Sequence, residues 1–160
     1  MSPEYLHILL NPLPVAGVLM GLIGLIVAFA LRSRPARVVA LSIVLLSSAI
    51  AWPAWYFGEK AYDDVMMIAD DPGSKWMDEH RSRAEKMVVV FYVLAALSLA
   101  AIVVPVKWPR SDVPLSGATL VVAVVALAAG AYIAYAGGRI RHSEFRSGAP
   151  PAAAEPGKAE

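Results

Sequence analysis

Four long apolar segments dominate this chain and constrain its fold more than any other feature. None of them contains Asp, Glu, Lys, Arg or His; they are Leu13–Leu31, Val38–Phe57, Met87–Val106 and Leu115–Ala136. A helix needs about 20 apolar residues to cross the hydrocarbon layer of a bilayer. Because backbone amides and carbonyls find no water there, each segment is predicted to be a helix. The predicted fold is all-α: an integral membrane, antiparallel four-helix bundle with short interfacial helices.

Composition narrows the possible functions of the chain. Of its 160 residues, 58% are hydrophobic, whereas soluble domains average about 45–50%. The prediction is one transmembrane domain over residues 1–146 and, because Ala, Pro, Gly and Glu cannot build a core, a disordered tail over 147–160. The net charge is only +1, which argues against a nucleic-acid partner. The absence of cysteine excludes disulfides, iron–sulfur clusters and thiolate zinc sites, but not haem b held by histidine.

The residues around the first span predict where its helix begins and what it packs against. Ser2, Pro3 and Glu4 are typical of a helix start, so a short interfacial helix is expected to about Leu10. The prolines of Asn11–Pro14 are expected to interrupt it. Gly17 and Gly21 lie on one face of the first span, and their spacing favours a close helix contact within the chain over a dimer contact.

The only long connection, residues 58–86, is predicted to be mostly helical. Pro53 should kink the second span near its end, and Ala61–Ala69 is expected to form a short amphipathic helix. Asp71–Gly73 is typical of a turn, after which Ser74 can cap a helix that continues into the third span. Two ion pairs at i, i+4 spacing are expected in that helix, Glu79–Arg83 and Arg81–Glu85.

All three histidines flank apolar segments at the same end of the predicted bundle. Two imidazoles on facing helices can ligate haem b, and histidines with carboxylates can hold a divalent metal. The plain alternative is that these are solvated surface side chains. For haem b the predicted binding residues are His80 and His142, with Arg141 facing a propionate. For a divalent metal the predicted ligands are His7, His80, His142, Glu59 and Glu144.

Short motifs at the ends of the spans carry a resemblance. They are Leu10-Asn11-x-Leu13-Pro14-Val15, Pro53-Ala54-x-x-x-Gly58-Glu59, His80 with Ala84, and Gly137-Gly138-x-Ile140-Arg141-His142-x-Glu144. Over about residues 5–145 the chain resembles a family of small four-span bacterial membrane proteins for which no reaction is established. The resemblance implies that Glu59, His80, His142 and Glu144 meet at one surface.

The chain departs from that family pattern at two positions. Pro12 stands where such proteins often carry His, and Arg81 stands where they tend to carry Glu. His7 lies about one helical turn before Pro12, so whether it takes over the role of the missing histidine stays open.

Orientation follows from basic residues near the spans. The two short loops carry Arg32, Arg34, Arg37, Lys107 and Arg110, although the opposite end has more basic residues in total. The first hairpin often dominates insertion, and no base precedes the first span. The prediction is therefore a multi-pass protein of the bacterial inner (cytoplasmic) membrane, with its termini and long loop outside the cytoplasm.

Two functions of different classes fit these patterns. The first is a small subunit that binds haem b or a metal at the extracytoplasmic face for electron transfer. The alternative is a cofactor-free accessory subunit of a larger complex, whose partners besides the lipid bilayer would be other membrane or extracytoplasmic subunits. Because no ionisable residue lies inside a span, a transport path within the chain is not favoured. No catalytic residue is predicted.

Overall fold

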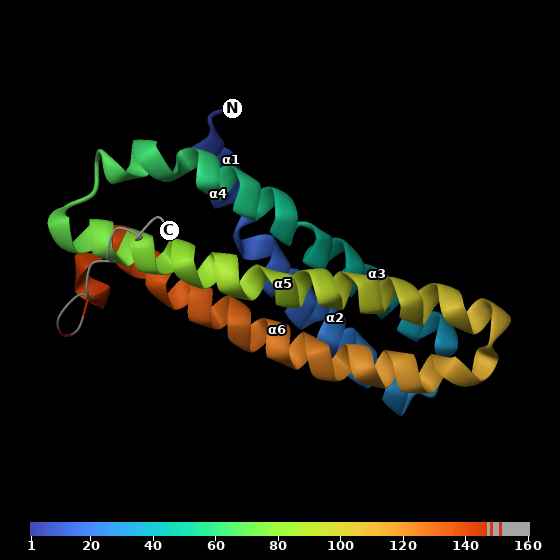
Figure 1. Cartoon of the computed structure of the whole chain (residues 1–160). Coiled ribbons are helices and arrows are strands. Elements are labelled where there is room, and N and C mark those ends of the chain that lie inside the picture. The colour runs from blue at the N-terminus through green and yellow to red at the C-terminus, as the bar shows by residue number, and fades with distance from the viewer. Residues whose placement is uncertain (147, 149–150, 152–160) are drawn as a thin grey trace, which may run out of the picture.

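The structure is a computed structural model that describes residues 1–146, 148 and 151. Every regular element in this part of the chain is helical (Figure 1). In chain order the elements are α1 (Pro3–Leu10), α2 (Pro12–Ala30), α3 (Arg34–Ala49), α4 (Ala51–Met66), α5 (Asp71–Lys107), η1 (Pro109–Ser111), α6 (Asp112–Arg141) and η2 (Ser143–Phe145).

These elements combine into four helices long and apolar enough to cross a membrane, as the apolar segments predicted. Their bounds are Pro3–Ala30, Arg34–Met66, Asp71–Lys107 and Pro109–Arg141. The tail predicted over 147–160 lies outside the described residues, except at Gly148 and Pro151.

Prolines account for the two short breaks within these long helices. The helix that begins at Pro3 is interrupted at Asn11, as predicted, because Pro12 and Pro14 have no amide hydrogen to donate to the preceding turn. The second break lies at Ile50, deeper in the apolar segment than predicted. Its cause is Pro53, which cannot donate to the carbonyl of Ala49, four residues earlier in the chain.

The connection between α4 and α5 is shorter than predicted. α4 continues without interruption to Met66, so Ala61–Ala69 is not a separate helix. α5 begins at Asp71 and not after Ser74, because the Asp70 side chain accepts a hydrogen bond of 3.1 Å from the Gly73 amide and caps the helix. A proline is well tolerated in a first helical turn, so Pro72 continues the helix where a turn was expected.

Small residues bring α2 close to α3. A Cβ atom on Gly17 would lie 1.9 Å from Oγ of Ser47, and one on Gly21 would lie 2.5 Å from Cγ2 of Val44. These glycines therefore pack within the chain, as their spacing predicted. α5 and α6 lie side by side along most of their length (Figure 1). The buried apolar core between the helices includes Val18, Leu25, Leu41, Val44, Phe91, Leu94 and Ala123.

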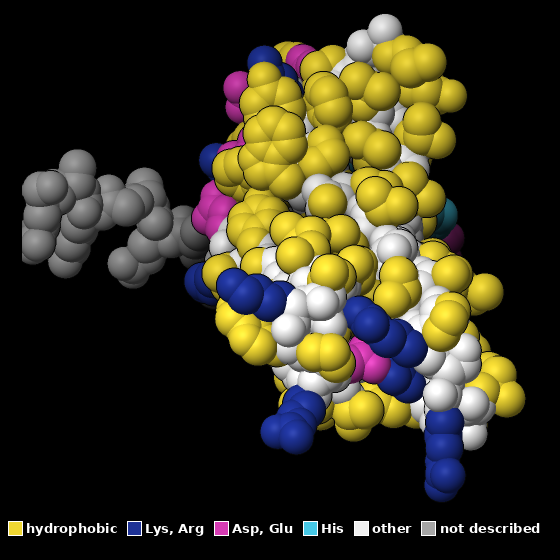
Figure 2. Space-filling model, turned by 90° about the vertical axis from the view of Figure 1, so that its right-hand side faces the viewer, with side chains coloured by type: hydrophobic (Ala, Val, Ile, Leu, Met, Phe, Trp, Pro, Cys, Tyr) yellow, Lys and Arg dark blue, Asp and Glu magenta, His cyan; other side chains and the backbone are white. Residues whose placement is uncertain are grey.

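The end of the molecule that carries the two short turns is basic (Figure 2). Beneath its exposed arginines and lysine, Arg37 of α3 forms a buried ion pair with Asp112, the first residue of α6. The two side chains are only 8% and 9% exposed. Phe29 covers the Arg37 guanidinium, whose carbon lies 5.5 Å from the ring centre. This ion pair ties the α2–α3 turn to the α5–α6 turn.

Removing one partner of the Arg37–Asp112 ion pair should destabilise the fold, because the other charge would stay buried. Asp112→Ala leaves the Arg37 charge buried and unpaired, so we expect a loss of about 3 kcal/mol in the free energy of unfolding. Denaturant unfolding in detergent measures this loss. The double variant Arg37→Met/Asp112→Leu should recover most of it, because no buried charge remains; a double variant as unstable as Asp112→Ala would contradict this account.

Candidate functional site

A cavity lies at the end opposite the short turns. There α1 and α4 diverge from α5 and α6 (Figure 1), and a cavity of about 450 Å³ opens between them. Trp55, Val65, Met77 and Ile140 are among its apolar walls. A few polar side chains interrupt these walls, and small-molecule sites combine such walls and groups in cavities of about 300–1,000 Å³. Of the six predicted site residues, four line this cavity: His7, Glu59, His80 and Arg141.

The cavity brings His7 of α1 together with His80 of α5. Their ring centres are 6.2 Å apart and the rings are nearly perpendicular. Nδ1 of His7 lies 2.8 Å from the carbonyl oxygen of Ala54, and Nδ1 of His80 lies 3.1 Å from that of Ile133. Since a carbonyl only accepts, both Nδ1 atoms must carry the proton. In the neutral rings Nε2 therefore holds the lone pair, and within the described chain neither Nε2 has a hydrogen-bond partner.

An ion pair joins the two sides of the cavity. Arg81 of α5 donates to both carboxylate oxygens of Glu59 on α4, at 3.1 and 2.6 Å, and also reaches Glu85 at 3.2 Å. The same guanidinium covers the ring of Tyr62 at 4.6 Å, and the Tyr62 hydroxyl donates to Asp78. Glu59 therefore lines the cavity with its charge already compensated. Both predicted pairs at i, i+4 spacing form, Glu79–Arg83 and Arg81–Glu85.

His142 and Glu144 lie together, but away from the cavity. α6 ends at Arg141, so His142 has extended backbone angles and is not on the helix face that would point towards His80. Its Nδ1 lies 2.8 Å from Oε1 of Glu144, and its ring lies 5.0 Å from that of Phe145. Both members of this pair are more than half exposed. The backbone of Glu144 and then the His142 imidazole hold the pKa of the Glu144 carboxyl below its ordinary value. Of the charged residues in the motif Gly137–Glu144, only Arg141 lines the cavity.

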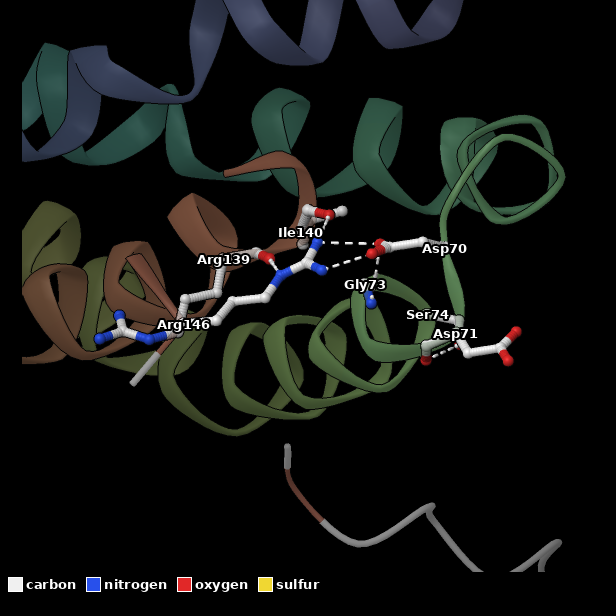
Figure 3. A network of polar contacts seen from close by, with 7 residues as sticks. All are labelled: Asp70, Asp71, Gly73, Ser74, Arg139, Ile140 and Arg146. Carbon is white, nitrogen blue, oxygen red and sulfur yellow. Dashed lines mark hydrogen bonds and ion pairs between the residues drawn. The ribbon is translucent and has the colours of Figure 1, made fainter. Parts of the chain in front are cut away.

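A third polar cluster fixes the end of α6 against the start of α5 (Figure 3). Arg146 binds both carboxylate oxygens of Asp70, at 2.5 and 2.9 Å, and donates to the carbonyls of Arg139 and Ile140 at 2.7 Å each. Gly73 permits this close approach, since a Cβ there would lie 2.6 Å from the Ile140 carbonyl oxygen. Because Ile140 lines the cavity, the cluster supports its wall.

Two further polar atoms mark the cavity. Oε2 of Glu4 and Nε1 of Trp55 are buried and have no hydrogen-bond partner among the described residues, and both residues line the cavity. A buried donor or acceptor without a partner costs about 1–3 kcal/mol. Sequence patterns identified neither residue, because both sit within ordinary helical and aromatic stretches.

The five metal ligands predicted from the sequence do not come together in one group. Among the described residues, no three His, Asp or Glu side chains are grouped closely enough to hold a metal ion. The five metal ligands predicted from the sequence divide instead into His7 with His80, Glu59 with Arg81, and His142 with Glu144.

Comparisons of the chain with protein-family models, curated proteins and solved structures find no match.

The Asp70–Arg146 contact should make stability depend on pH. The guanidinium beside it, as the largest cause, lowers the pKa of the Asp70 carboxyl from its ordinary value of 3.8. The stabilisation is therefore complete above about pH 4 and is lost as the pH falls through the lowered pKa. Asp70→Asn should remove this part of the acid dependence of thermal unfolding. Asp64→Asn, which removes an exposed carboxylate from α4, should keep it; identical acid profiles for Asp70→Asn and the parent would contradict the assignment.

Proposed function

We propose that the chain is a multi-pass membrane protein whose long helices form an antiparallel bundle and whose cavity binds haem b through His7 and His80. The observation that carries this proposal is the pair of neighbouring imidazoles in one largely apolar cavity, each with Nδ1 anchored to a backbone carbonyl. Bound haem b would supply one-electron transfer. The proposed function is therefore that of a small electron-transfer subunit.

The residues of the cavity fit such a group in three respects. Histidines that ligate a metal nearly always donate their other ring N–H to a carbonyl, carboxylate or water, as His7 and His80 do. The His7 and His80 imidazoles would hold the haem iron. Arg141 is exposed at the cavity and has no ion-pair partner among the described residues, so it is available to a propionate.

His7 takes the place in this proposal that the sequence alone gave to His142. Haem binding through His80 and His142 would need both rings at one site, whereas His142 is outside the cavity and held by Glu144. A divalent metal without porphyrin is less well supported, because Glu59 already binds Arg81.

We also propose that the cavity faces away from the cytoplasm of a bacterial cell. The short turns at residues 31–37 and 107–112 hold five basic residues, three of them in the first hairpin, and no Lys or Arg precedes the first span, although the opposite end holds eight basic residues within 1–146. An excess of Lys and Arg in short loops is typical of the cytoplasmic side. Figure 2 shows the basic side chains projecting from the short-turn end.

Visible spectroscopy of the purified protein tests the haem proposal. Protein expressed with a haem precursor should show a Soret band, and haem titration of the apoprotein should restore that band. His7→Ala and His80→Ala should each lower haem affinity at least about 10-fold, because each removes one imidazole that would hold the haem.

His142→Ala is the matched control for those variants and should leave the band unchanged, since that imidazole is outside the cavity. A band lost in His142→Ala but kept in His7→Ala would restore the pairing of His80 with His142. A colourless protein that takes up no haem would overturn the proposal and leave the cofactor-free accessory subunit.

The lack of cysteine makes orientation directly measurable, because an introduced thiol is unique. Leu31→Cys at the short-turn end and Met67→Cys near the cavity replace side chains that are 67% and 78% exposed, and neither changes a charge. In intact spheroplasts a membrane-impermeant maleimide should label Met67→Cys only. Labelling of Leu31→Cys alone would reverse the proposed orientation.

A further inference from the structure

His7 and His80 occupy equivalent places on two different helices. His7 binds the carbonyl of Ala54 on α4, and Gly58 follows that residue by four positions. His80 binds the carbonyl of Ile133 on α6, and Gly137 again follows by four positions. The same arrangement therefore occurs twice around the cavity, although the two imidazoles come from α1 and α5.

Helix geometry explains why glycine stands at each of these positions. The carbonyl of residue i already accepts the amide of residue i+4, so an imidazole that also reaches it must lie where the side chain of residue i+4 begins. A Cβ on Gly58 would lie 2.8 Å from Nδ1 and 2.9 Å from Cε1 of His7. A Cβ on Gly137 would lie 3.0 and 3.1 Å from the same atoms of His80. An added Cβ at Gly58 would force the His7 ring to shift, and one at Gly137 would require the His80 ring to give by a few tenths of an ångström.

The hydrogen bond at Nδ1 decides what the other ring nitrogen can do. With Nδ1 protonated, Nε2 of a neutral ring is an electron-pair donor and cannot donate a proton. Two rings fixed in this way each carry a lone pair on Nε2, and both residues line one cavity. Such a pair suits an electron-pair acceptor such as iron, or a ligand that donates hydrogen bonds, and disfavours a ligand that only accepts them.

We propose that Gly58 and Gly137 are positioning residues that fix His7 and His80 in the Nδ1–H form and so select electron-pair acceptors as ligands of this cavity. Identification of the ligand as haem b rests on the function proposed above. The form of the two imidazoles does not, because it is set by contacts within the protein.

Nitrogen NMR of protein labelled at histidine tests the inference without any ligand. At a pH where the rings are neutral, His7 and His80 should each show a protonated Nδ1 and a lone pair on Nε2. The signals are assigned by removing one histidine at a time. The opposite form in either ring of the parent protein would overturn the proposal.

Paired glycine variants test the role of the two positions. Gly137→Ala should release His80 into a mixture of both neutral forms and lower haem affinity about 10- to 100-fold. Gly58→Ala should do the same to His7. Gly138→Ala is the matched control for Gly137, since its Cβ would meet only Phe145 at 3.8 Å, and Gly117→Ala is the control for Gly58, since its Cβ would meet nothing within 4 Å.

Each result separates the two proposals. All four changes raise helix propensity by a similar amount, so a general effect on the helix would appear in the controls as well. Unchanged histidine signals in both Gly58→Ala and Gly137→Ala would overturn the positioning role. Parent protein that binds no haem, but loses the Nδ1–H form of His80 in Gly137→Ala, would overturn the haem proposal and support the positioning role.

Discussion

The exclusion of charge from four long apolar segments governs the arrangement of everything else in this chain. A helix without ionisable residues in its middle can place such groups only at its two ends, so polar chemistry gathers there. The ends then differ because their sequences differ. One is a compact basic surface tied together by Arg37 and Asp112, and the other is a set of projecting helices of mixed charge. The second holds the cavity of about 450 Å³.

Local sequence predicted most of the helices and some of their contacts. The four long helices, the start at Pro3 and the interruption at Asn11 follow from hydropathy and from proline chemistry. Pairs separated by four residues, such as Glu79 and Arg83, also formed as predicted, because helix geometry alone brings them together. The sequence placed the break caused by Pro53 too close to the end of the apolar segment. The hydrogen bond that Pro53 cannot donate is the one to the carbonyl of Ala49, four residues before it, so the helix breaks at Ile50.

Contacts between distant segments could not be derived in the same way. Nothing in the composition around His7 indicates that its ring lies against Gly58 and reaches Ala54, because this depends on how α1 folds against α4. Asp112 was overlooked for a similar reason, although a lone acid in the second basic turn was a usable signal. The expected meeting of His80 with His142 assumed one more helical residue than α6 contains. His7, whose role the sequence left open, is the histidine beside His80.

The break at Ile50 has a mechanical consequence for the cavity. It divides one long rod into a part that packs along α2 and a part that carries Trp55, Gly58 and Glu59. Since the Ala49 carbonyl lacks an amide from Pro53, the ladder is weakest at that point, and the second part can change its tilt there at low cost. Because His7 is bound to Ala54 on that second part and His80 is bound to Ile133 on α6, a change of tilt at Ile50 would alter the spacing of the two imidazoles.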